Sequence, residues 1–177
     1  MDERNRGRLT KDGIRIYEPA DFDGMRRAGR LAAEILVAVA PMVEVGQTTW
    51  ALDAAIERMI DDAGAKSATI GYKGYQHASC ISVNHVVCHG IPGPKVLKDG
   101  DILNIDVTVI VDGWFGDTSR MYVAGKLSRK AERLIQVTHD ALFEGIGAVR
   151  PGSTFGDIGH AIQTFVEAER MSVVRDF

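Results

Sequence analysis

The sequence predicts an α/β fold in which amphipathic helices flank an antiparallel sheet, and three observations lead to this prediction. The segment Asp101–Val123 has the pattern of one long β-hairpin. Four other segments place apolar side chains every three or four residues, as helices with one buried face do. The pattern of one helical region also recurs later in the chain, which indicates a pseudo-two-fold repeat.

The hairpin is the best defined of these elements. Asp112-Gly113 lies between two runs of Val, Ile and aromatic residues, and this dipeptide is the strongest short-range hairpin signal. A two-residue loop fixes the register by counting outward from the turn, and side chains alternate between the two faces. The pairs expected are Val111 with Trp114, Thr108 with Asp117, and Asp106 with Ser119. One face is then expected to carry Asp106, Thr108, Ile110, Phe115, Asp117 and Ser119.

Asp106 and Asp117 form a diagonal cross-strand pair in this register, which places them about 7–8 Å apart. Paired carboxylates on rigid strands suit hard divalent cations, and bridging carboxylates hold two ions about 3.5–4 Å apart in two-metal hydrolases. The alternative is that both aspartates point to water while Ile105, Val107 and Val109 are buried on the other face. The pattern alone leaves both interpretations open.

Composition limits the class of protein. The 177 residues are 45% hydrophobic and 25% charged, enough for one globular core or a little more. The net charge of −3 argues against nucleic-acid or membrane binding driven by charge. Cys80 and Cys88 are expected to be free thiols in a reducing compartment. No secretory signal is visible, and the apolar run Leu31–Val43 is too short to span a bilayer.

The first part of the chain is predicted to contain a loose arm and two helices. Residues 1–20 begin with a polar, basic and Gly-punctuated stretch, so we expect a loose N-terminal arm. Asp21–Val39 has helical periodicity. The second helix begins near Thr48 or Thr49, either of which can cap it, and ends before Gly64.

Two histidines near the middle of the chain have different predicted settings. The segment Ser79–Val87 is predicted to be a buried strand, which makes His85 an ordinary polar strand residue. A strand separates His85 from His89 by about 13 Å, too far for both rings to share one ion. His89 is expected to project into a cleft, because it stands where the strand breaks into the Gly90–Pro94 turn.

Two more helices follow the hairpin. Ser128 can cap a third helix that runs to about Val149, and Thr154 with Asp157 can open a fourth through a capping box. The buried face expected for the fourth helix consists of Phe155, Ile158, Ala161, Ile162, Phe165 and Val166.

The repeat relates the second helical region to the fourth. A Val-x-x-Gly-x-Thr pattern followed by a helical apolar pattern begins at Val43 and again at Val149, 106 residues later. Duplication predicts two equivalent halves, 21–127 and 128–177. The next strand of the second half would begin at Ser172, and the chain stops soon after, at Phe177. We therefore expect the second half to be incomplete.

Five segments together resemble the type I methionine aminopeptidases. They are GYKGY, ISVNHVVCHGIPG, LKDGDILNIDVTVIVDGWFGDTSRMY, VRPGSTFGDIGHAIQTFVEAE and SVVRDF, in that order, and the resemblance extends from about Phe22 to Phe177. It implies the pita-bread fold, two pseudo-symmetric halves around a central antiparallel sheet. It also implies removal of the initiator methionine from nascent chains whose second residue is small.

The resemblance also implies roles for six residues. Asp106 and Asp117 match two aspartate metal ligands of the family, and His89 matches a histidine that hydrogen-bonds the substrate near the scissile amide. Tyr72, Tyr75 and Cys80 match positions that line the pocket for the methionine side chain, where a soft thiol and aromatic edges suit a thioether.

The implied cofactors are two divalent metal ions, for which Co, Mn, Fe, Zn and Ni all stay open. The implied substrates are nascent peptides that begin with Met. The ribosome is a further candidate partner, no nucleic-acid or membrane partner is expected, and a complete chain is expected to be a cytoplasmic monomer.

The resemblance also implies that the sequence stops before the C-terminal third of the family pattern. The family's other ligands, one histidine and two glutamates, lie beyond the point that matches Phe177. These 177 residues alone are therefore expected to bind metal weakly and to be inactive as an aminopeptidase. Two other hypotheses stay open: a non-catalytic module that binds peptide or ribosome, and a split enzyme completed by a second polypeptide.

Overall fold

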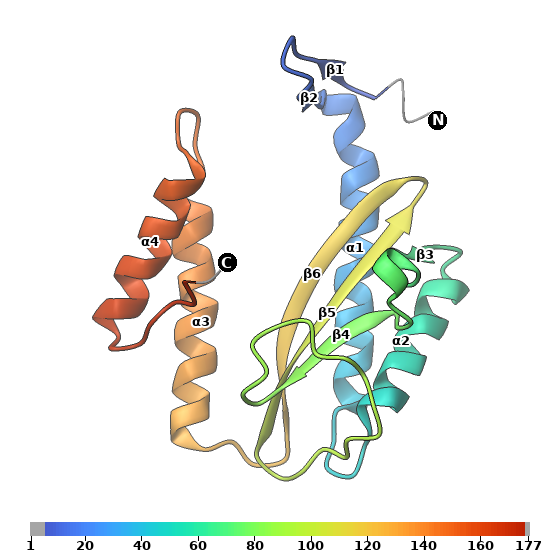
Figure 1. Ribbon diagram of the computed structural model, residues 1–177, viewed down its shortest axis with the longest axis vertical. Coiled ribbons are helices and arrows are strands. Elements are labelled where there is room, and N and C mark those ends of the chain that lie inside the picture. Colours follow the sequence, from blue (N-terminus) through green and yellow to red (C-terminus); the bar gives the residue numbers. More distant parts are fainter. Residues whose placement is uncertain (1–5, 176–177) are drawn as a thin grey trace. The chain divides into compact units, whose positions relative to one another are not determined.

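The computed structural model describes residues 6–175, and the chain divides into two compact units, Met1–Lys126 and Leu127–Phe177 (Figure 1). The first unit contains a sheet with two helices, and the second contains two helices.

The predicted hairpin forms the centre of the first unit. Strands β5 (Asp101–Val111) and β6 (Trp114–Ala124) pair antiparallel along their whole length. The predicted register is confirmed, because Thr108 lies opposite Asp117 and Asp106 opposite Ser119. Both turn residues have positive φ angles, 51° at Asp112 and 76° at Gly113, as a two-residue hairpin turn of this kind requires.

Two further strands pair with the other edge of β5. Strand β4 (Ser79–Val83) pairs with its first half, and the short strand β3 (Lys66–Ser67), which the sequence did not predict, pairs near its end. Helices α1 (Phe22–Val39) and α2 (Thr49–Asp62) cover one face of this sheet (Figure 1). Short 3₁₀ segments occur at Pro19–Asp21, Ala40–Met42 and Tyr72–Gly74.

The hydrophobic core lies between the sheet and these two helices. The β5 side chains that face the helices are fully buried: Leu103, Ile105, Val107 and Val109. They pack with the apolar faces of α1 and α2, including Ile35, Leu36, Leu52 and Ile56. Because side chains alternate along a strand, Asp106 and Asp117 lie on the opposite face of the sheet.

Helix α1 and strand β6 approach each other closely at Gly116. A Cβ atom at this position would lie 2.2 Å from the backbone carbonyl of Ala28, which no relaxed structure tolerates. Only glycine therefore allows this packing. The close contact fixes the position of β6 relative to α1, and with it the position of Asp117, the next residue of the strand.

The structure corrects the prediction of a strand over Ser79–Val87. Strand β4 ends at Val83, and the chain turns at Asn84, which has a φ angle of 55°. The Asn84 side chain donates to Asp101 and accepts from the N–H of Ile102, so it closes the turn against the start of β5. His85 consequently lies in an exposed turn and not in a strand. The β-branched residues Val86 and Val87 favour a strand, but the turn at Asn84, with its local hydrogen bonds, outweighs their strand propensity.

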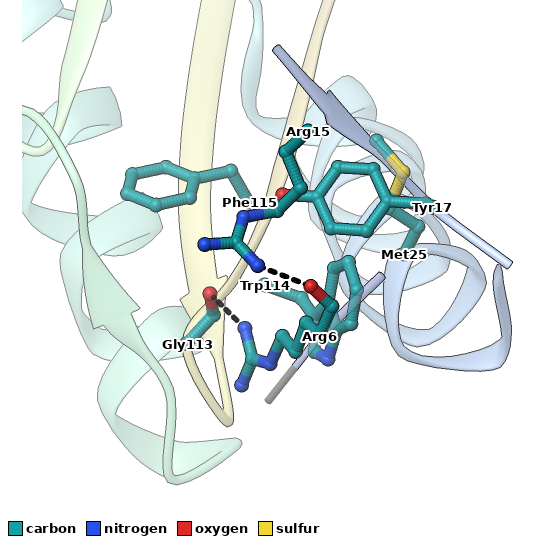
Figure 2. A pocket seen from close by; sticks show the side chains of 7 residues that line it. All are labelled: Arg6, Arg15, Tyr17, Met25, Gly113, Trp114 and Phe115. Carbon is teal, nitrogen blue, oxygen red and sulfur yellow. Dashed lines mark hydrogen bonds between the residues drawn. The ribbon is translucent and has the colours of Figure 1, made fainter. Parts of the chain in front are cut away.

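The structure also differs from the expected loose arm over the described residues 6–20. Strands β1 (Arg8–Leu9) and β2 (Arg15–Ile16) pair as a small hairpin. Arg6, at its start, is 5% exposed. Figure 2 shows the Arg6 guanidinium beside Trp114, 4.3 Å from the ring centroid, and bonded to the carbonyl of Gly113 at 2.8 Å. A cation–π contact in a desolvated setting contributes about 2 kcal/mol.

Tyr17, which follows the second strand of the small hairpin, also packs against Trp114. Its ring lies 5.2 Å from that of Trp114, and Arg15 donates a hydrogen bond to the carbonyl of Arg6 (Figure 2). We call Arg6, Arg15, Tyr17 and Trp114 the N-terminal clasp. The clasp joins residues about a hundred positions apart in sequence, so composition near the N-terminus gave no sign of it.

The second unit is a pair of helices, α3 (Arg129–Gly147) and α4 (Phe155–Ala168). The predicted caps are confirmed: Ser128 accepts from the third N–H of α3, and Thr154 with Asp157 forms a capping box. The predicted burial of the α4 face is wrong, because Val166 is the only buried residue of that set and Phe155 is 93% exposed. Two helices bury only the stripe where they meet, and a wider apolar face needs another layer.

The predicted repeat is visible in backbone detail. Helices α2 and α4 both have 14 residues and are related by the same spacing of 106 positions. The glycine before each helix has a left-handed φ, 94° at Gly46 and 92° at Gly152. Thr48 and Thr154 both cap their helices by accepting the N–H three residues on.

Within the part of the chain that the structure describes, no helix is both long enough and apolar enough to cross a membrane.

Candidate active site

A pocket of about 680 Å³ lies on the face of the sheet opposite α1 and α2. It brings together all six residues that the sequence singled out, which are Tyr72, Tyr75, Cys80, His89, Asp106 and Asp117. Its lining also includes Lys73, Ile91, Thr108 and Phe115. The last two were expected on this face from the hairpin register, whereas nothing in the sequence pattern identified Lys73 and Ile91 as lining residues.

The two carboxylates come from adjacent strands and converge. Asp106 is half-buried on β5 and Asp117 is exposed on β6. Burial raises the pKa of Asp106, and the negative charge of Asp117 and a close side-chain contact with it raise that pKa further. The Thr108 hydroxyl donates a hydrogen bond of 3.0 Å to Asp117, which orients that carboxylate. The arrangement is a pair of like charges held together by a rigid hairpin.

His89 lies at the edge of this pocket in an unusual backbone conformation. Its φ angle is 54°, a left-handed value that costs a non-glycine residue free energy and often occurs at functional sites. Two hydrogen bonds to β4 hold the next residue, Gly90. Its N–H donates to the Ser82 hydroxyl, and the Gly90 carbonyl accepts from the N–H of Ile81 at 2.8 Å. His89 is close enough to lower the pKa of Asp106. The imidazole is exposed, so it is available to a substrate.

The aromatic wall comes from a tight loop that precedes β4. Gly71 and Gly74 have φ angles of 86° and 83°, which let the loop turn twice within a few residues. The Tyr75 hydroxyl donates to the carbonyl of Ser79 at 2.8 Å. Burial raises the pKa of Tyr75, and a hydrogen bond with Cys80 raises it further. Tyr75 therefore stays neutral as a wall of the pocket.

Cys80 stands beside Tyr75 on the same face of the sheet and directly opposite Asp106 in the β4–β5 register. Burial raises the pKa of the thiol, the Tyr75 hydrogen bond lowers it, and the negative charge of Asp106 raises it again. The net shift is upward, so the group is a neutral thiol. It is a small, polarisable surface next to the carboxylates.

The carboxylate pair fits a divalent cation. Asp106 and Asp117 repel one another, and the charge of Asp117 raises the pKa of Asp106. A hard cation between the two carboxylates would remove this repulsion. Among the described residues 6–175, no group of three or more His, Cys, Asp and Glu side chains surrounds a common point. Asp106 and Asp117 are therefore the candidate ligands that these residues offer.

Comparison with known proteins identifies the family of the chain. The model of metallopeptidase family M24 matches residues 23–177. The methionine aminopeptidases of Rickettsia prowazekii and Escherichia coli strain K12 are 52% and 50% identical to the chain over 164 and 166 residues. In both cases the match covers 93% of this chain and 63% of the relative.

A solved structure extends the comparison to the fold. The crystal structure of methionine aminopeptidase from Rickettsia prowazekii superimposes with a TM-score of 0.91 at 52% identity, covering 93% of this chain and 66% of that one. The pita-bread fold that the sequence predicted is confirmed by this likeness, as is the resemblance to methionine aminopeptidases. The chain belongs to metallopeptidase family M24, and the family description implies a divalent metal cofactor.

Proposed function

We propose that this chain supplies the metal-binding carboxylates and the substrate pocket of an aminopeptidase that removes an N-terminal methionine. The observation that supports the proposal most is the convergence of six side chains from β4, β5, β6 and two loops on one pocket. The methionine aminopeptidases that are about half identical to this chain support the same reaction. The chain spans 63% of the length of these relatives.

Each side chain of the pocket has a proposed task. Asp106 and Asp117 hold the metal through their carboxylate oxygens, and Thr108 keeps Asp117 in orientation. His89 hydrogen-bonds the substrate beside the scissile amide from the pocket edge. Tyr72, Tyr75 and Cys80 enclose the methionine side chain, whose polarisable thioether suits aromatic edges and a neutral thiol.

The family's metal fits these residues because they offer two hard oxygen donors whose mutual repulsion a cation removes. Divalent ions held there would supply Lewis-acid polarisation of the scissile carbonyl and an activated water. We propose two ions, with Co, Mn, Fe, Zn and Ni as candidates. Because the described residues offer two carboxylates, we expect the chain by itself to bind metal weakly.

The substrates proposed are nascent chains that begin with Met and continue with a small residue, and the site of action proposed is the cytoplasm. The pocket supports the first point, because its aromatic and thiol wall suits one unbranched apolar side chain. Association with the ribosome is a further proposal.

The test is hydrolysis of a Met-Ala-Ser peptide by protein purified without metal and then titrated with Mn²⁺ and Co²⁺. The chain alone is expected to show little or no turnover, and any turnover should require metal and disappear in Asp106→Asn and Asp117→Asn. The matched control is Asp112→Asn, which changes a carboxylate at the tip of the same hairpin and leaves the pocket intact.

Turnover that persists in a chelator or in either pocket variant would contradict the proposal. Peptide binding without any turnover at saturating metal would favour a second function, a non-catalytic peptide-binding module. One observation favours that alternative: among the described residues, no group of three or more His, Cys, Asp and Glu side chains is placed to hold one metal ion.

A further inference from the structure

A buried polar network lies directly behind the wall of the candidate pocket. Its centre is Asp53 on α2, a carboxylate that is 5% exposed. One oxygen of Asp53 accepts from the backbone N–H of Ser79 at 2.9 Å and from the Ser79 hydroxyl at 2.6 Å. The other oxygen lies 2.8 Å from Nδ1 of His77. An ionised carboxylate only accepts hydrogen bonds, so Nδ1 of His77 is the donor.

The network fixes the point where the aromatic loop becomes strand β4. Ser79 is the first residue of β4 and is completely buried on the face toward α2. Cys80, the next residue, points to the opposite face and lines the pocket. A hydrogen bond that holds Ser79 therefore also fixes the position of Cys80, because one strand carries both.

The same network reaches the second pocket residue of this wall. The Tyr75 hydroxyl donates to the carbonyl of Ser79 at 2.8 Å, and its ring meets the His77 ring edge-on at 5.6 Å. The carbonyl of His77 accepts from the Thr69 hydroxyl at 2.7 Å, which ties the two ends of the loop together. Tyr75 is thus held by two residues that Asp53 itself holds.

The burial of Asp53 needs an explanation, because a carboxylate in an apolar core costs free energy unless it is fully paired. It lies between Leu52 and Ile56 on the apolar face of α2, where a small hydrophobic residue would pack without that cost. Three hydrogen bonds in different directions give what an apolar residue cannot: one fixed orientation for the adjoining loop and strand.

We propose that Asp53 is a positioning residue, which through Ser79 and His77 sets the spacing of the Cys80–Tyr75 wall and so the preference of the pocket for an unbranched side chain. This inference rests on the proposed function, since it assumes that the wall contacts the substrate side chain. Asp53 itself touches neither the pocket nor the carboxylate pair.

The test uses Cys80 as an internal reporter of pocket occupancy. The chain has two cysteines, so Cys88→Ser leaves Cys80 as the sole thiol. Alkylation of Cys80 by iodoacetamide is measured with increasing L-methionine amide or L-leucine amide. The readout is the ratio of the two concentrations that halve the alkylation rate. Each variant serves as its own reference, so changes in thiol reactivity or in the folded fraction cancel in the ratio.

We expect the parent to prefer methionine amide. In Asp53→Ala the ratio of the two concentrations should fall by about threefold or more, a change within the range that a hydrophobic pocket gives for one methylene. Ser79→Ala, which removes one of the three hydrogen bonds, should lose about twofold. Asp53→Asn should recover most of the preference, because its amide oxygen still accepts from Ser79 and its amide can pair with the other tautomer of His77.

The control is Val39→Ala, which removes two methyl groups from a fully buried position on α1 and should leave the ratio unchanged. Equal ratios in the parent, Asp53→Ala and Val39→Ala would overturn the inference. If Asp53→Ala does not fold, Ser79→Ala becomes the test variant, and a ratio equal to that of the parent would then overturn the inference. If L-methionine amide does not protect Cys80 in the parent, the proposed function is contradicted instead, before any Asp53 variant is compared.

Discussion

The close approach of β6 to α1 gives a prediction whose size follows from the structure. In Gly116→Ala the new Cβ would lie 2.2 Å from the Ala28 carbonyl and 2.6 Å from the backbone nitrogen of Gly29. To lengthen the shortest contact from 2.2 Å to the 3.4 Å of ordinary van der Waals contact, strand and helix must separate by about 1.2 Å. Both partners are backbone, so no side chain can rotate away.

This separation opens the core between α1 and the sheet, so we expect Gly116→Ala to lower the free energy of unfolding by about 3 kcal/mol, at the upper end of overpacking effects. Gly29→Ala is the matched control. It lies inside α1, nothing would lie within 4 Å of its new Cβ, and better helix propensity should stabilise the protein by about 1 kcal/mol.

Urea unfolding followed by circular dichroism measures both free energies. The metal site offers a second readout, since a shifted β6 moves Asp117 relative to Asp106. Mn²⁺ affinity should therefore fall in Gly116→Ala and stay unchanged in Gly29→Ala. A Gly116→Ala protein within about 0.5 kcal/mol of the parent, the usual size of a surface effect, would refute the packing argument.

Three smaller predictions concern contacts outside the pocket. Tyr122→Phe should lower the free energy of unfolding by about 1–2 kcal/mol, because it leaves the buried carbonyl of Leu36 without its donor; a change below 0.3 kcal/mol in urea unfolding would speak against that bond. Thr154→Ala should cost about 1 kcal/mol by removing the cap of α4, and amide hydrogen exchange in the first turn of that helix should speed up; unchanged exchange would argue against the cap. Arg6→Met should release the N-terminal clasp from Trp114, so limited trypsin digestion should cut the arm faster than in the parent; equal cleavage rates would show that the clasp does not hold the arm.

The hairpin and its site were predictable because their rules are local. A two-residue turn at Asp112-Gly113 fixes every pair along β5 and β6, so Asp106 and Asp117 could be assigned to one face by counting. The turn after the predicted strand indicated His89, the resemblance added Tyr72, Tyr75 and Cys80, and all six residues line one pocket. Which face was buried could not be decided by alternation, and it is the packing of α1 and α2 that decides it.

The features that sequence reasoning missed are tertiary. The clasp of Arg6 on Trp114 and the network of Asp53, His77 and Ser79 join residues that no local pattern connects. One signal was present for the network: an aspartate on the apolar face of a predicted helix must find a partner. The end of β4 was missed because the strand propensity of Val86 and Val87 was not weighed against Asn84, a residue that favours turns.

The measurement that tests the central claim most directly is paramagnetic broadening of backbone amide signals by Mn²⁺, which detects weak binding and needs no turnover. We predict that broadening centres on Asp106, Asp117 and His89. It should disappear in Asp106→Asn and in Asp117→Asn and persist in Asp112→Asn. Broadening that survives both pocket substitutions, or that centres on other carboxylates, would contradict the assignment of this pocket as the metal site.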